Sequence, residues 1–122
     1  MENEKSFNIE CKINVTITQS MIDDILADAL DGGITYWCGE ADVVGDYLGD
    51  YTSDQISRGG SIKLRDIEDE NEEWVLDLDK FLAGYRKSIE KGYWSGDYER
   101  DYDSSVADVI IQLALFEEII YG

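Results

Sequence analysis

An alternating segment near the N-terminus constrains the fold of this 122-residue chain more than any other feature. Apolar residues occupy every second position from Phe7 to Ile17, and Asn, Glu, Lys or Thr fills each position between them. Successive side chains of a β-strand point to opposite faces, so the pattern predicts a long strand with one buried and one solvated face. A sheet with one solvated face is commonly antiparallel.

A helical pattern follows this predicted strand. Ser20 stands where an N-cap is expected, and apolar residues then recur at helical spacing as far as Leu30. We expect Gly32 and Gly33 to end the helix in the left-handed conformation. The aspartates of this stretch lie largely on the opposite face, which indicates a solvated surface and not a metal site.

Further strands are predicted after the helix. Residues 34–44 form one, in which Gly39 and Gly45 indicate a bulge or a close backbone approach. Residues 61–67 and 74–76 form a hairpin around an exposed acidic loop. Residues 47–57 contain a turn and a short helix, which ends at paired glycines.

Two more helices complete the pattern. Asp77 caps a helix that Gly92 ends, and the chain then passes through an aromatic and charged loop. The last helix begins near Ser104 or Ser105 and runs to about Tyr121. Its apolar residues point all round the axis, which favours burial in a subunit interface. We therefore expect one α+β domain over residues 1–122, oligomeric, with an antiparallel sheet of about four strands covered by three helices.

The stretch GGITYWCGEADVVGDYLGDYTSDQISRGG, residues 32–60, is the candidate binding segment. Its glycines allow a ligand to approach the backbone and its N–H groups. Its aromatic residues, among them Tyr47 and Tyr51, offer faces on which planar rings stack. The segment therefore indicates a nucleotide-like ligand. The alternative is an ordinary strand between two tight turns.

Composition excludes several kinds of function. The chain carries 28 acidic and 10 basic residues, and its net charge of −18 repels nucleic acids and anionic membranes. It contains no histidine, which excludes histidine-based catalysis and histidine-containing zinc sites. Two cysteines cannot close a four-thiolate zinc site, and no phosphate-binding loop motif is present. We expect no enzyme activity, no catalytic residue, no metal and no cofactor.

Cysteine usage and hydropathy indicate a cytoplasmic protein. Cys11 and Cys38 fall in predicted strands and are expected to be reduced core thiols. No apolar run approaches the roughly 20 residues that cross a bilayer, and the N-terminus lacks the apolar stretch of a signal peptide.

Three arginines have a context that suits an anionic ligand: Arg58 beside two glycines, Arg86 in the second helix and Arg100 in the aromatic loop. Guanidinium groups bind phosphates through directional, charge-assisted hydrogen bonds. Each arginine has an alternative role in a surface salt bridge. The candidate ligand-binding residues are Tyr36, Trp37, Arg58, Gly59, Gly60, Phe81, Arg86 and Arg100.

Three strings of the sequence resemble a family of small phage and prophage proteins, the first-described Thoeris anti-defence proteins. These strings are DDILADALDGGITYWCGEADVVGDYLGDYTSDQISRGGSIKLRDIE, LDLDKFLAGYRKSIEKG and ADVIIQLALFEEIIYG. The resemblance covers nearly the whole chain from Met21 onward. The N-terminal strand and residues 93–103 carry little of it.

The resemblance implies a sponge for a signalling nucleotide in an infected or lysogenic bacterial host. Members of the family bind glycocyclic ADP-ribose, a cyclic ADP-ribose isomer made by the TIR-domain sensors of Thoeris defence, and keep it from its effector without degrading it. They form homodimers or higher homo-oligomers, and some hold cyclic oligonucleotides at separate sites. The residues fit this activity, since a sponge needs stacking and phosphate-binding groups but no catalytic ones.

A second function is compatible with the composition. The acidic surface, with its run from Asp66 to Glu73, could mimic nucleic acid and inhibit a DNA-binding defence protein of the host. Binding by such a mimic would weaken steeply with salt, whereas a nucleotide pocket would be less affected. Which cyclic nucleotide is preferred, and whether the site lies within one subunit or between two, is left open by the sequence.

Overall fold

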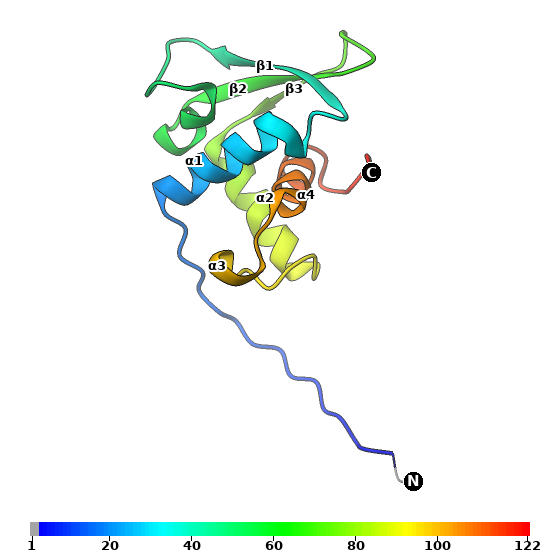
Figure 1. Ribbon diagram of the computed structural model, residues 1–122. Helices are drawn as coiled ribbons and strands as arrows, with labels where there is room; N and C mark the ends of the chain where they lie inside the picture. Colours follow the sequence, from blue (N-terminus) through cyan, green and yellow to red (C-terminus); the bar gives the residue numbers. More distant parts are fainter. Residues whose placement is uncertain (1–2) are drawn as a thin grey trace.

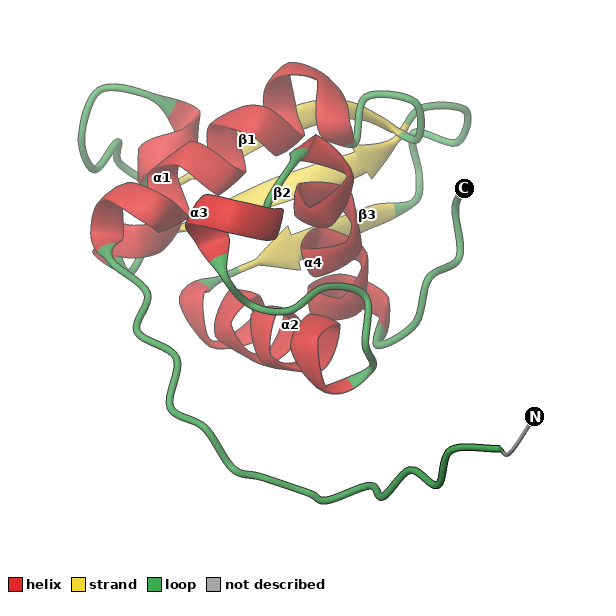
Figure 2. Ribbon diagram, turned by 60° about the horizontal axis from the view of Figure 1, so that its bottom comes forward, coloured by secondary structure: helices red, strands yellow, loops and turns green. Residues whose placement is uncertain are grey.

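Three antiparallel strands form one layer of the protein, and the helices cover one face of that layer (Figures 1 and 2). This architecture is taken from a computed structural model, which describes residues 3–122. The strands are β1 (Cys38–Val44), β2 (Ser61–Asp66) and β3 (Glu73–Leu76), in the order β1-β2-β3. The predicted hairpin is confirmed as β2-β3, and the register shift between Cys38 and Glu40 confirms the bulge expected at Gly39.

Three long helices make the second layer, as the sequence predicts, and the whole forms a single α+β domain. They are α1 (Gln19–Asp28), α2 (Leu78–Glu90) and α4 (Ser104–Phe116). Four shorter pieces join them: a π-helical turn η1 (Ala29–Gly33), the 3₁₀ turns η2 (Thr52–Asp54) and η3 (Ile56–Arg58), and α3 (Tyr98–Asp101).

The ends of α1 differ from the prediction. Thr18 caps the helix in place of Ser20, because its extended backbone lets the hydroxyl accept a hydrogen bond from Met21 N at 3.2 Å. The left-handed stop expected at Gly32 and Gly33 is wrong, since neither glycine has a positive φ. The helix instead widens into η1, in which Ala29 O accepts a hydrogen bond from Ile34 N at 3.0 Å.

The other helix ends agree more closely with the sequence. The Asp77 carboxylate caps α2 as predicted by accepting a hydrogen bond from Lys80 N at 2.9 Å, and Gly92 adopts a left-handed φ of 79° after its last turn. Asp103, directly before the expected Ser104, caps α4. That helix ends at Phe116 and not near Tyr121, because Glu117 turns left-handed there.

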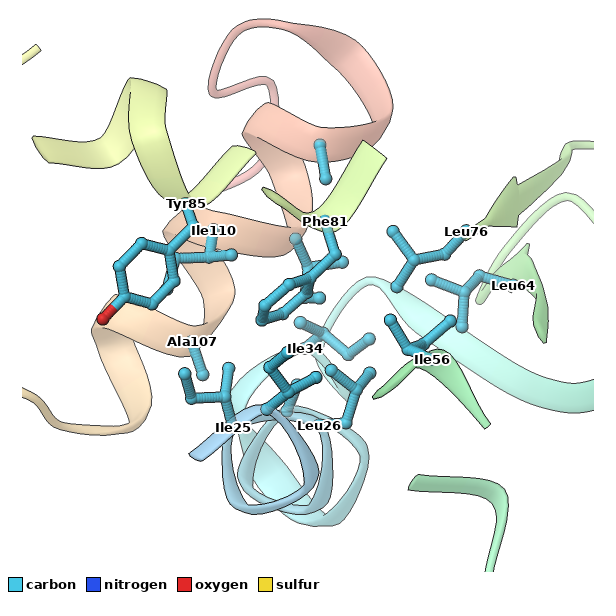
Figure 3. Close-up of a cluster of buried hydrophobic side chains, with 14 of the residues drawn as sticks. Ile25, Leu26, Ile34, Ile56, Leu64, Leu76, Phe81, Tyr85, Ala107 and Ile110 are labelled. Atoms are coloured by element: carbon cyan, nitrogen blue, oxygen red, sulfur yellow. The ribbon is translucent and has the colours of Figure 1, made fainter. Parts of the chain in front are cut away.

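The core lies between the sheet and the helix layer (Figure 3). Leu64 and Leu76 reach it from the sheet and Ile25 and Leu26 from α1, while Phe81 fills its centre from α2. All of these side chains are almost fully removed from water. Their burial supplies the main driving force for this packing.

Helix α4 is the central helix of the layer (Figure 2). It packs against α1, η1, α2 and β3 of the same chain, and this burial accounts for apolar residues all round its axis. Leu113 is 1% exposed within one chain, so the helix itself gives no reason to place a subunit interface there. No helix in residues 3–122 has the length and hydropathy needed to cross a bilayer.

The N-terminal strand prediction is wrong for the single chain. Residues 3–17 are extended but pair with no strand, and they leave the domain as a separate arm (Figure 1). The sheet therefore has three strands and not about four. Cys11 lies exposed on the arm, whereas Cys38 is buried as expected. Alternation fixes which side chains share a face, but a strand also needs a neighbouring edge to pair with.

Gly84 should be intolerant of a side chain, because a Cβ there would lie 2.5 Å from Ile110 O and 2.7 Å from the Ala114 Cβ on α4. We expect Gly84→Ala to lower the free energy of unfolding in urea by about 1–3 kcal/mol. Gly32→Ala is the matched control, since a Cβ at Gly32 meets no atom within 4 Å. If both variants unfold at the same urea concentration, the close α2-α4 contact is contradicted.

Candidate functional site

A buried glutamine organises the irregular segment between β1 and β2. The Gln55 side chain accepts a hydrogen bond from Leu48 N at 2.8 Å, and it donates to Leu48 O at 2.8 Å and to Tyr51 O at 2.7 Å. The Asp54 carboxylate accepts hydrogen bonds from Asp50 N and Tyr51 N, each at 3.0 Å. These bonds satisfy backbone groups that no strand or helix pairs, and they give the segment a defined shape.

Arg58 ends this segment with only part of its guanidinium engaged. Its Nη1 donates to Asp23 Oδ2 at 3.2 Å and to Asp54 O at 3.0 Å. Within residues 3–122, Nε and Nη2 make no hydrogen bond, and the side chain is 34% exposed. Arg58 therefore has the salt bridge that the sequence offered as its alternative role, and it also keeps donors for an anion.

The glycines beside Arg58 shape the turn and are not free donors in this structure. Gly59 has a φ of 86°, which favours glycine. Its N–H donates to Ile56 O at 3.1 Å, and the N–H of Gly60 donates to Gln55 O at 2.8 Å. Both N–H groups are therefore paired with carbonyls of the same turn.

Trp37 lies in the core with its ring covered by aromatic neighbours. It stacks on Tyr121 at 4.9 Å between ring centroids and 3° between planes, and it meets Trp74 and Phe116 edge-on. Only 1% of Trp37 is exposed. In this arrangement Tyr121 occupies the place that a stacking ligand would take.

Tyr36 and Trp37 share one carboxylate of α4. Asp108 accepts hydrogen bonds from Tyr36 Oη at 2.5 Å, from Trp37 Nε1 at 2.8 Å and from Gln112 Nε2 at 2.9 Å. Desolvation, together with the bond to Asp108, raises the pKa of Tyr36 to about 12. The Gln112 carbonyl in turn accepts from Tyr121 N at 2.9 Å, which holds the C-terminal segment over the aromatic cluster.

The sequence carries a weak sign of this network. Asp108 and Gln112 are polar residues one turn apart in an otherwise apolar helix, and such residues need partners when buried. The far end of the C-terminal segment is also tied, because Tyr121 Oη donates to Asp66 Oδ2 at 2.7 Å. This hydrogen bond is the largest cause that lowers the pKa of Asp66.

The remaining candidate residues do not join Arg58. Phe81 is fully buried in the core, and Arg86 is an exposed residue of α2 that pairs with Glu90 one turn later. Arg100 lies in α3, which Figure 1 places far from the sheet and from η3. Of the eight candidates, the structure brings Arg58, Gly59 and Gly60 into one turn and Tyr36 and Trp37 into one network.

Two surface features lie close to the Arg58 turn. Tyr47 is 61% exposed, and its neighbours Leu48 and Gly49 lie against Gly60 and the Arg58 Nε. A groove of about 540 Å³ runs between α1 and β1, lined by Ala27, Leu30, Asp31, Ala41, Tyr51, Thr52 and Ser53. No cluster of metal-ligating side chains occurs in the part of the chain that the structure describes.

Removing the shared carboxylate should loosen the C-terminal segment. An asparagine at position 108 has one acceptor oxygen for three donors, so Asp108→Asn should lower the free energy of unfolding by about 1–3 kcal/mol. Asp46→Asn is the matched control. It removes the same charge from an exposed residue without a hydrogen bond among residues 3–122, and it should change the free energy of unfolding by less than about 0.5 kcal/mol. Urea titration followed by tryptophan fluorescence measures both, and equal midpoints would argue against the network.

Comparison with known proteins adds no relative to this picture: no protein-family model, no curated protein and no solved structure matches the chain.

Proposed function

We propose that this protein sequesters a cyclic ADP-ribose isomer, glycocyclic ADP-ribose, and thereby blocks a TIR-domain defence pathway without degrading the signal. The observation that carries the proposal is the Arg58 turn, where a partly exposed guanidinium keeps Nε and Nη2 free of hydrogen bonds to residues 3–122. The resemblance of the sequence from Met21 onward to the Thoeris anti-defence family supplies the identity of the ligand.

The pyrophosphate of the ligand binds at Arg58. Asp23 and Asp54 hold Nη1 and orient the guanidinium plane, so the remaining nitrogens are positioned before the ligand arrives. A bidentate contact to phosphate is charge-assisted and stronger than a neutral hydrogen bond. Gly59 leaves space beside the turn, because no atom lies within 4 Å of the position that a Cβ of this residue would occupy.

The adenine ring stacks on an aromatic face near this turn. Trp37 and Phe81 are buried in the core, and Tyr36 is held in the Asp108 network, so the role passes to the exposed Tyr47. Stacking of a base on an aromatic side chain is worth about 1–3 kcal/mol. Tyr47 and Arg58 lie on the same segment, and the Gln55 side chain holds that segment through hydrogen bonds to its backbone.

Sequestration without turnover fits the chemistry of the chain. It contains no histidine, so no imidazole can act as a general base on the bound nucleotide. We expect protein that has been incubated with extract of cells carrying an activated TIR defence system, washed and heated to release a compound with the mass of glycocyclic ADP-ribose. Release of a cleaved nucleotide, or of none, would contradict sequestration.

Arg58→Ala tests the site directly. Loss of the guanidinium contact should weaken binding of glycocyclic ADP-ribose by about 1.5–3 kcal/mol, or roughly ten- to a hundredfold, in calorimetric titration. Arg58→Lys should recover only part of this affinity, because an ammonium lacks the planar fork. The salt bridge to Asp23 is partly exposed, so the fold should be retained.

Arg86→Ala is the matched control, since Arg86 is an exposed arginine whose partner Glu90 lies on the same helix. It should leave the affinity unchanged within about twofold, because a surface ion pair contributes little. If Arg86→Ala weakens binding and Arg58→Ala does not, the phosphate site lies on α2. If neither variant changes the affinity, the Arg58 turn is not the ligand site.

A further inference from the structure

The N-terminal arm, residues 7–17, exposes an apolar stripe that the single chain leaves uncovered. Phe7 and Ile9 are 85% and 84% exposed, and Ile13 and Val15 are also exposed. All of them lie on one side of an extended backbone, because they occupy alternate positions. Each large apolar side chain would gain about 1.5–3 kcal/mol from full burial, so the arm has a strong tendency to find a partner surface.

The domain has a surface that matches such a strand. Strand β1 pairs with β2 on one side only, and within residues 3–122 no strand lies along its other edge. Beside this open edge lies the groove lined by Ala27 of α1, Leu30 of η1 and Ala41 of β1. Ala41 is paired with the buried Leu64, so its side chain points toward the helix layer. The groove therefore lies along the open edge of β1 and next to the helix layer, and Tyr51, Thr52 and Ser53 close its other side.

The side-chain pattern of the arm fits this position. A strand added beside β1 would direct one set of alternate residues into the groove and the other set to the outer face of the sheet. The apolar set would cover Ala27 and Leu30, and the polar set, which includes Lys12, would lie beside Glu40 and Asp42 of β1. Two lysines balance two glutamates in residues 3–17, so the arm approaches this acidic protein without the repulsion that its other surfaces would meet.

The arm cannot reach its own β1 edge without dismantling the start of α1. Thr18 caps the helix immediately after the arm, and Ile17 packs against the core. Connections between a strand and a helix commonly need 2–6 residues, and none are left between Ile17 and Thr18. Folding back would convert Val15 to Ile17 into a loop and remove this packing. A second copy of the chain offers the same edge with no such cost.

We propose that residues 7–17 of one copy add a fourth strand to the sheet of a second copy, along β1 and over the groove between α1 and β1. Main-chain hydrogen bonds to the open edge supply part of the affinity, and burial of the apolar stripe supplies the rest. The surface is separate from the Arg58 turn, so this association does not depend on the proposed ligand.

Amide hydrogen exchange and sedimentation of the full-length protein, carried out at the same tens of micromolar concentration, test the proposal. We expect an oligomer in which the amides of residues 7–17 exchange slowly. A monomer with a protected arm would show that the arm folds onto its own sheet, and an oligomer with an unprotected arm would place the interface elsewhere. A monomer with an unprotected arm would leave the arm without a partner. Each of these three results overturns the proposal.

A matched pair of double variants tests the contribution of the apolar face. Ile9→Lys with Ile13→Lys places two charges on the stripe, and we expect it to weaken self-association at least about 100-fold. Asn8→Lys with Asn14→Lys places the same two charges on the polar face, on the side of Glu40 and Asp42, and should not weaken self-association. The arm is exposed in the single chain, so both variants should retain the fold. Equal loss of association in the two variants would contradict insertion of the apolar stripe into the groove.

Discussion

The contact between α2 and α4 is the packing on which the rest of the domain depends. Gly84 brings the two helices close enough for Ile110 O and Ala114 to lie where a side chain would stand. This places α4 between α2 on one side and α1 with η1 on the other, and it lets the sheet close over all of them. A small domain buries a limited apolar area, and a central helix contributes to it because its side chains are buried on all sides.

Polar side chains stabilise the segments that lie outside helices and strands. Gln55 holds the segment between β1 and β2, and Asp108 with Gln112 holds the C-terminal segment over Trp37. Each replaces the backbone partners that a strand or helix would have provided. Polar contacts also link charged side chains on the surface: Arg65 forms salt bridges with Glu40 at 2.5 Å and with Glu73 at 3.0 Å across the outer face of the sheet. Scarce positive charge is thus placed between carboxylates, where it reduces their mutual repulsion.

The two proposed interactions use different chemistry on neighbouring surfaces. The Arg58 turn offers charge-assisted hydrogen bonds to a small anion, whereas the β1 edge offers unpaired backbone groups beside an apolar groove. Both surfaces adjoin the segment that Gln55 organises. A strand bound along β1 would lie near Tyr51, which belongs to the same segment as Tyr47 and Arg58.

The sequence by itself determined the α+β class, the β2-β3 hairpin, the bulge at Gly39 and the Asp77 cap, because each follows from local periodicity or from one residue's backbone preference. Only the tertiary structure decided that α4 is surrounded by its own chain and that Trp37 is covered by Tyr121, since both depend on contacts between distant segments. The same reason explains why Arg58 could be proposed but its partner Asp23 could not. The alternation from Phe7 to Ile17 lies between these cases: it specifies a strand with one apolar face, but within residues 3–122 of one chain no strand pairs with it.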